Sequence, residues 1–266
     1  MLEGIQVPSR LSPAALTRFR LCNRQFLLVD VERVPRREQP NPLLAQGNAI
    51  HAALERFFGL RPEDRTQPVE VLQRALRSQW RACWKSEALG NADTEIEFGR
   101  KALSMLGAFP EHFDTTAEPL AREQWVQTTL SNGFELFGKV DRIDPFEDGL
   151  DLIDYKTGKY QLDADDLSGE PAAQVYALAG EATFGRPVRR VRYLYLASGQ
   201  QIAWWSERED LAALADKLTE LTDAIRSSAF PAFPGEHCRW CPAALHCIDR
   251  GRVELAELAT PEGLPF

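Results

Sequence analysis

Two aspartates and a lysine lie in neighbouring segments whose composition predicts β-strands. Asp141 belongs to FELFGKVDRID, and Asp154 and Lys156 belong to GLDLIDYKTG. Alternate residues of a strand point to the same side, so Asp154 and Lys156 share one face. A turn at Asp148-Gly149 would fold the second segment back on the first. The sequence therefore predicts that Asp141 lies near Asp154.

Two carboxylates and a lysine at a strand end suit phosphoryl chemistry. Carboxylate oxygens hold hard divalent cations, and such a cation polarises a phosphate and lowers the pKa of a bound water. The lysine can position that water or stabilise developing negative charge. On spacing alone, the alternative is a buried aspartate–lysine ion pair without a chemical role.

A histidine on a predicted helix is a further candidate ligand. The segment LLAQGNAIHAALERFFG has apolar residues at helical spacing, and His51 lies near its middle. Gly47 precedes His51 by one turn, and helical side chains lean towards the N-terminus. We therefore expect open space over the imidazole, as a ligand site needs. A lone histidine on a helix is more often structural, so this motif is a weak signal by itself.

Four of the five cysteines form a second candidate site. Cys238, Cys241 and Cys247 lie within ten residues, and Cys22 is available as a fourth ligand. Clustered cysteines in an intracellular protein are more often metal ligands than disulfides. Spacing alone does not separate zinc from an iron–sulfur cluster, and a histidine before each of Cys238 and Cys247 offers zinc an alternative ligand. Cys83, beside two tryptophans, is expected to pack in a helix.

Composition and charge narrow the class of protein. The 266-residue chain has a formal net charge of −8 and no run of about 18 apolar residues that would predict a membrane span. Its first segment, MLEGIQVPSRLSP, lacks a secretory signal pattern, which predicts a cytoplasmic protein. The charge argues against a general polyanion-coating protein, but not against a nucleic-acid enzyme with a local basic track. Two arginine clusters could form such a track or simply a solvated surface: Arg33, Arg36 and Arg37, and Arg186, Arg189, Arg190 and Arg192.

The order of predicted elements indicates the fold class. Residues 35–115 are expected to be mainly helical, and strands follow from 122 to 156. A helix around PAAQVYALAGEATFG, two further strands and a long helix complete the pattern. A small mixed sheet flanked by helices is typical of an α/β or α+β fold. We expect residues 1–266 to form one domain.

The motifs together resemble a known family. GKVDRID and LIDYKTG are similar to the D…(D/E)xK core of the PD-(D/E)XK nucleases, and GNAIHAALERF to the histidine-bearing helix of their RecB-like branch. SPAALTRFRLC and CRWCPAALHC resemble the cysteine segments of the iron–sulfur members of that branch. These members include AddB-type nuclease domains and the CRISPR-adaptation exonuclease. The matches occur in the family's order from Leu11 to Cys247, which is nearly the whole chain.

This resemblance implies a restriction-endonuclease-like core and a deoxyribonuclease that depends on Mg²⁺ or Mn²⁺. His51, Asp141, Asp154 and the backbone carbonyl of Tyr155 would be metal ligands, and Lys156 would be the catalytic lysine. The expected activity is that of an exonuclease on single-stranded DNA or duplex ends in DNA repair or recombination. The alternatives are a nuclease that trims DNA before CRISPR integration and a non-cleaving DNA-binding scaffold protein.

Three further residues are candidate accessory groups. Glu123 precedes the core strands where similar proteins often carry a glutamate, although a surface glutamate is the alternative. The branch usually has a glutamine four residues before a tyrosine on the helix after the lysine strand. Here Gln174 and Tyr176 are only two apart, and Ala172 occupies the expected glutamine position. Residues two apart on a helix point in different directions, so we expect only one to face DNA. Core packing is the alternative for Tyr176.

For the four cysteines, the resemblance favours a 4Fe–4S cluster over zinc. Residues 236–250 together with Cys22 would then staple the two ends of the chain. We expect a structural role, because a site closed by four cysteines has no open coordination position. Besides DNA, the resemblance implies a helicase or a CRISPR-adaptation protein as a partner.

Overall fold

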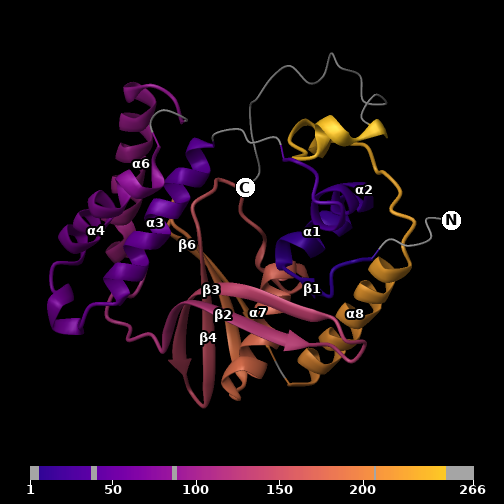
Figure 1. Ribbon diagram of the computed structural model, residues 1–266. Helices are drawn as coiled ribbons and strands as arrows, with labels where there is room; N and C mark the ends of the chain where they lie inside the picture. The colour runs from indigo at the N-terminus through magenta and orange to yellow at the C-terminus, as the bar shows by residue number, and fades with distance from the viewer. Residues whose placement is uncertain (1–5, 37–40, 86–88, 207, 250–266) are drawn as a thin grey trace.

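The chain folds around one mixed β-sheet with helices on both sides (Figure 1). The computed structural model describes residues 6–36, 41–85, 89–206 and 208–249. After a two-residue first strand, the elements within these ranges follow the order that the sequence predicts. The predicted mixed α/β class is confirmed. No helix of these ranges is long and apolar enough to cross a membrane.

Six strands form the sheet in the order β1-β3-β4-β5-β6, and β2 also pairs with β3. β3 is antiparallel to β2 and β4, whereas β4 and β5 are parallel. A parallel pair needs a crossover connection, which α7 supplies. The bounds are Arg10–Leu11 (β1), Ala121–Thr129 (β2), Glu135–Phe146 (β3), Gly149–Lys156 (β4), Val188–Tyr195 (β5) and Gln200–Trp205 (β6).

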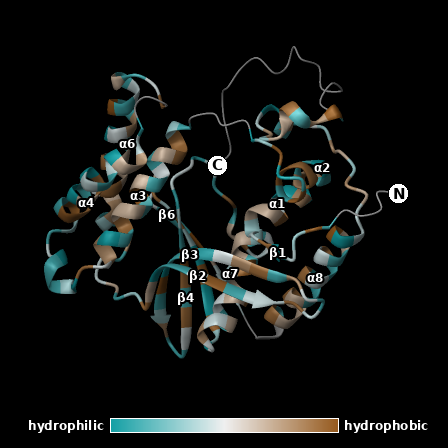
Figure 2. Ribbon diagram, in the orientation of Figure 1, coloured by the Kyte–Doolittle hydropathy of each residue, from teal (hydrophilic) through white to brown (hydrophobic). Residues whose placement is uncertain are grey.

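Two hydrophobic cores lie on opposite sides of the sheet. On one side α1, α7 and α8 pack against residues such as Val140, Leu152 and Val191. On the other side α3, α4 and α6 pack against Ile153 and Tyr155. In Figure 2 hydrophilic and hydrophobic residues alternate along α4 and α8, as expected of helices with one buried and one exposed face. The helix bounds are Pro13–Leu21 (α1), Asn23–Phe26 (α2), Pro42–Phe58 (α3), Pro68–Cys83 (α4), Ala92–His112 (α6), Pro171–Phe184 (α7) and Arg208–Ser227 (α8).

Side-chain caps define the first residues of α1 and α3. The Ser12 hydroxyl accepts a hydrogen bond of 3.2 Å from the Ala15 amide at the start of α1. The Asn41 side chain accepts bonds of 3.0 and 3.3 Å from two amides at the start of α3. Both helices have proline in their first turn, where no intrahelical donor is needed.

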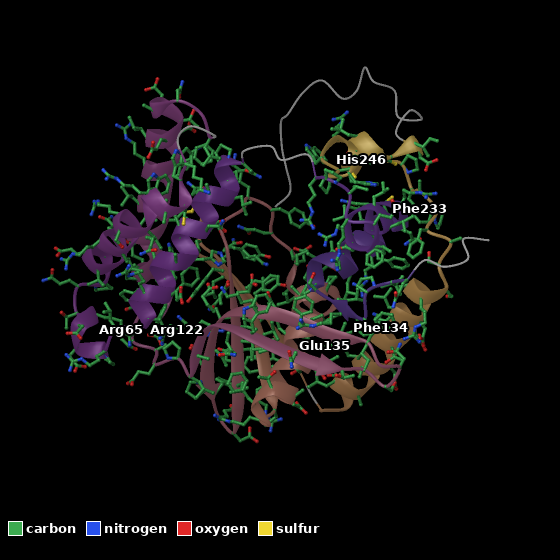
Figure 3. The ribbon with its side chains drawn as sticks, in the orientation of Figure 1. Arg65, Arg122, Phe134, Glu135, Phe233 and His246 are labelled. Atoms are coloured by element: carbon green, nitrogen blue, oxygen red, sulfur yellow. The ribbon has the colours of Figure 1, made fainter. Side chains whose placement is uncertain are left out.

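The end of the described chain returns to the segment after α1. A π-helix, Leu27–Val31, contributes Leu28 and Val29 to a small core with Ala243. Cys238 lies in a short 3₁₀ helix, Glu236–Arg239, Cys241 lies between it and a second one, Ala244–His246, and Cys247 directly follows the second. Figure 3 shows Phe233 and His246 beside this N-terminal segment. Of the predicted staple 236–250, residue 250 lies outside the described residues.

Candidate active site

The β2–β3 hairpin places two carboxylates opposite each other. Gln124 of β2 pairs with Val140 of β3, so Glu123 comes to lie across from Asp141. Glu123 has a backbone φ of +46°, which is rare for a residue other than glycine in a strand. Such a conformation costs roughly 1–3 kcal/mol and tends to occur at functional sites.

Helix α3 brings His51 to these carboxylates. His51 Nδ1 lies 3.1 Å from Asp141 Oδ1, and the amide of Tyr155 donates a 2.7 Å hydrogen bond to Asp141 Oδ2. One ligand atom from each of His51, Glu123 and Asp141 lies within 4.8 Å of the other two. We call these three residues the ligand group. Glu123, which the sequence placed only near the site, is therefore part of it geometrically.

Gly47 lies where α3 meets the end of β4. A Cβ added to it would lie 3.2 Å from Thr157 Oγ1, the one atom outside its own helix backbone within 4 Å. The glycine therefore lets α3 approach the end of β4 closely. The space over the His51 imidazole stays a prediction.

Asp154 and Lys156 form a second set of charges beside the ligand group. Lys156 Nζ lies 2.6 Å from Asp154 Oδ2 and 4.1 Å from the centre of the Tyr193 ring. Asp154 is buried, whereas the Lys156 side chain is 34% exposed. Asp154 lies outside the ligand group, and its carboxylate pairs with Lys156 as that of Glu123 pairs with Lys139.

Like charges crowd this part of the sheet. Burial and the negative charge of Asp154 raise the pKa of Asp141, although His51 and the Tyr155 amide oppose this. Burial lowers the pKa of His51, but the charges of Asp141, Asp154 and Glu123 outweigh it and leave this pKa raised. Burial likewise lowers the pKa of Lys156, while Asp154 and Asp141 raise it more. An excess of carboxylates with one imidazole is a donor set that a divalent cation would stabilise.

Tyr176 and Gln174 point to different surroundings, as two-residue spacing predicts. A Cβ on Gly138 would lie 2.7 Å from Tyr176 Cε1, so the tyrosine ring packs directly on β3. Burial, and then the charges of Asp154 and Asp141, raise the pKa of Tyr176 well above its ordinary value. Tyr176 therefore faces the site from within the core.

Gln174 is buried away from that face and joins α1 to α7. Its side-chain oxygen accepts a 3.1 Å bond from Arg20, and its amide nitrogen donates a 2.8 Å bond to the Ser168 carbonyl. Arg20 also donates to the carbonyl of Gly169 at 2.9 Å. The glutamine thus fixes the start of α7.

Sequence reasoning missed two residues that border the charged set. Glu170 precedes α7, and burial raises its pKa while Lys156 and Arg20 lower it. Tyr193 of β5 pairs with Asp154 in the sheet. Its buried hydroxyl has no hydrogen-bond partner among the described residues. The position of Glu170 just before a helix after the lysine strand was a usable signal. No sequence signal marked Tyr193, because its position beside Asp154 depends on the register between β4 and β5.

The four predicted cysteines line one pocket. Cys22, Cys238, Cys241 and Cys247 surround it together with apolar residues and the polar residues Gln25, His237 and Asp249. Burial and the neighbouring thiols raise the pKa of Cys241, against the effect of one backbone bond. The Phe233 amide lies 3.4 Å from Cys22 Sγ as a hydrogen-bond donor. His246 is directed elsewhere, with Nε2 3.1 Å from the Pro35 carbonyl oxygen.

The second arginine cluster is largely neutralised by acidic side chains. Arg190 and Arg192 both contact the buried Asp151, at 2.7 and 2.5 Å. Arg189 pairs with Asp148 at 2.5 Å. This cluster therefore stabilises the start of β4, at the opposite end of that strand from Lys156.

Comparisons with known proteins concern the family and the fold. A family model described as the PD-(D/E)XK nuclease superfamily matches residues 10–247. No curated protein is similar to the chain. Among solved structures, the crystal structure of a "putative exonuclease" from Eubacterium rectale is similar in fold, with a TM-score of 0.50 and 10% sequence identity. The alignment covers 88% of this chain and 87% of that chain.

The match of the family model extends over nearly the whole described structure and includes every residue of the ligand group. Members of this superfamily have a restriction-endonuclease-like core, which the mixed sheet and its flanking helices match. A nuclease of this kind uses a divalent metal and acts on DNA. The chain belongs to the PD-(D/E)XK nuclease superfamily.

Proposed function

We propose that the protein is a divalent-metal-dependent DNA exonuclease that hydrolyses phosphodiester bonds at single-stranded or duplex ends. The observation that carries the proposal is the meeting of the ligand group with Asp154 and Lys156, from α3 and the three neighbouring strands β2, β3 and β4. The fold shared with the similar structure from Eubacterium rectale agrees with it. We further propose that residues 1–266 form one nuclease domain in DNA repair or recombination.

The ligand group fits a hard or borderline cation. Carboxylates suit Mg²⁺ and Mn²⁺, and the imidazole of His51 adds a nitrogen donor that favours the transition metal. Asp154 and the carbonyl of Tyr155 would complete the ligands. A cation bound there would polarise the scissile phosphate and activate a water.

The protein's own groups would orient the reaction. Lys156, held by Asp154, places a positive charge where negative charge develops on the phosphate. Tyr176 packs on Gly138 and keeps the carboxylate side of the site dry. Glu170 balances the charges of Lys156 and Arg20 at the margin.

We also propose that the four-cysteine pocket holds a 4Fe–4S cluster with a structural role. The four cysteines line one pocket. The resemblance of their segments to those of iron–sulfur nucleases supports the cluster over zinc.

An exonuclease needs a free DNA end, whereas an endonuclease does not. A substrate without ends therefore tests the proposal. Linear and circular forms of one single-stranded DNA would be incubated with protein purified without oxygen and with Mn²⁺ or Mg²⁺. We expect the linear form to be degraded and the circle to survive. Cleavage of the circle at the same rate would contradict exonuclease action. A helicase or CRISPR-adaptation partner stays a prediction from the resemblance.

A further inference from the structure

The outer face of the β2–β3 hairpin carries an aromatic pair next to the ligand group, an exposed tryptophan and a half-buried phenylalanine. Trp125 is 59% exposed, and its ring centre lies 5.9 Å from that of Phe137. Lys139 is paired with Trp125 across the strands and lies 2.5 Å from Glu123. The aromatic pair is therefore separated from Glu123 of the ligand group only by Lys139.

Phe137 also lines a basic groove of about 320 Å³ between β1 and the π-helix segment. The guanidinium of Arg10 lies 4.6 Å above the Phe137 ring and 2.6 Å from Glu135. In Figure 3 Glu135 is seen on β3 below α1, at this side of the sheet. The aromatic pair and the groove thus form one continuous surface.

The groove is electropositive in a chain whose formal net charge is −8. Arg33 and Arg36 line it, and within the described residues neither has a carboxylate at ion-pair distance. Its one aspartate, Asp30, is neutralised by Arg18 through bonds of 2.7 and 2.6 Å. Arg33 has a φ of +53°, a strained conformation for arginine. Free guanidinium groups beside an aromatic face are complementary to phosphate and base.

We propose that this surface, Trp125, Phe137 and the groove with Arg10, Arg33 and Arg36, holds the single-stranded DNA that leads into the active site. Bases stack on Trp125 and Phe137, and phosphates lie along the arginines. The inference rests on the proposed function, because it names the part of the substrate that the site receives. A single strand fits better than a duplex, whose bases hide their faces from a flat aromatic pair.

The other end of the sheet offers a matched control. Trp205 is 56% exposed, its ring centre lies 5.8 Å from that of Phe146, and Arg190 lies 4.2 Å above Phe146. This pair resembles the first in the exposure of its tryptophan, in the separation of its ring centres and in an arginine that is paired with a carboxylate. It differs because the ligand group and the groove with Arg33 and Arg36 are built from other residues.

The test measures binding without cleavage. Fluorescein-labelled oligo(dT) would be titrated with wild type, Trp125→Ala, Phe137→Leu and Trp205→Ala in EDTA, with anisotropy as the readout. Circular dichroism would show that each variant is folded. Trp125→Ala should weaken binding roughly 5- to 100-fold, as expected for one lost stacking partner. Trp205→Ala should change it less than about twofold by the same reasoning.

The double variant Arg33→Ala/Arg36→Ala tests the phosphate contacts independently. Each phosphate contact to a single strand contributes about 0.7 to the slope of log affinity against log salt. The double variant should therefore lower the slope by roughly 1.4. Equal binding by the Trp125→Ala and Trp205→Ala variants, or an unchanged slope, would overturn the proposal.

Three further outcomes distinguish this inference from RNA binding and from the proposed function. A tenfold preference for oligo(U) would overturn the commitment to DNA. The proposed function can fail independently of this inference. If wild type binds oligo(dT) through Trp125 but never cleaves it, the DNA-binding surface would be supported and the exonuclease activity contradicted. Conversely, if wild type cleaves DNA with a metal and Trp125→Ala binds oligo(dT) normally, the DNA-binding surface would be contradicted and the proposed function would not.

Discussion

The position of Glu123 alters the set of ligands expected from sequence. The motif implied His51, Asp141 and Asp154, yet Glu123 joins the first two within 4.8 Å, while Lys156 holds Asp154. A strand glutamate looks like a surface residue in sequence. Its inward placement depends on the β2–β3 register and on a positive φ, and neither can be read from residue types.

Glu123→Gln tests this placement. The change removes a charge from the ligand group, so we expect Mn²⁺ affinity measured by calorimetry to fall at least about tenfold. Glu55→Gln is the control, because Glu55 also influences Lys139 but is not in the ligand group. Equal affinities for the two variants would exclude Glu123 as a ligand.

His51→Ala addresses the nitrogen donor. Because imidazole suits transition metals better than Mg²⁺, we expect the variant to lose most of its preference for Mn²⁺ over Mg²⁺ in a cleavage assay. The ratio of the two metal-dependent rates is the measurement. An unchanged ratio would indicate that His51 only positions Asp141, through their 3.1 Å contact.

At the scale of elements, alternation and turn signals predicted the strands that carry Asp141, Asp154 and Lys156. The close approaches between elements could not be predicted. Gly47 lets α3 approach Thr157, a contact that the sequence did not predict. Gly138 similarly lets α7 approach β3. In both cases the partner atom comes from a segment distant in sequence. The spacing of residues within one motif therefore cannot predict the contact.

Gly138→Ala tests the contact of α7 with β3. The new Cβ would lie 2.7 Å from Tyr176 Cε1, so the ring must move, and we expect a loss of about 1–3 kcal/mol in unfolding free energy. Denaturant unfolding measures it. Gly169→Ala is the control, because its Cβ would meet no atom within 4 Å. Comparable stabilities of the two variants would contradict the packing described.

At the scale of the whole molecule, the cysteine pocket joins the ends of the described chain. Three cysteines spaced within ten residues could be recognised in sequence, whereas the approach of Cys22 depends on how residues 27–34 pack under Ala243. The first arginine cluster shows the same limit. Two of its arginines, Arg33 and Arg36, line one groove with Phe137, which is more than a hundred residues away in the sequence. The sequence alone could not show that they adjoin an aromatic side chain.

Cys22→Ser tests the proposed staple. A link that closes so long a loop contributes about 2–4 kcal/mol, so we expect the melting temperature to fall by roughly 4–16 °C and the iron content to drop. Cys83→Ser, outside the pocket, should retain its iron. A Cys22→Ser protein with full iron content and normal melting would contradict the staple.

The central claim is that Lys156 and the ligand group form a metal-dependent phosphodiesterase site. The most direct measurement is the cleavage of end-labelled single-stranded and duplex DNA by wild type and Lys156→Ala, with Mn²⁺, Mg²⁺ or EDTA. We predict cleavage by wild type with either metal, none in EDTA, and a loss of roughly 10²- to 10³-fold in the variant. Cleavage by Lys156→Ala at the wild-type rate, or by wild type in EDTA, would contradict the account.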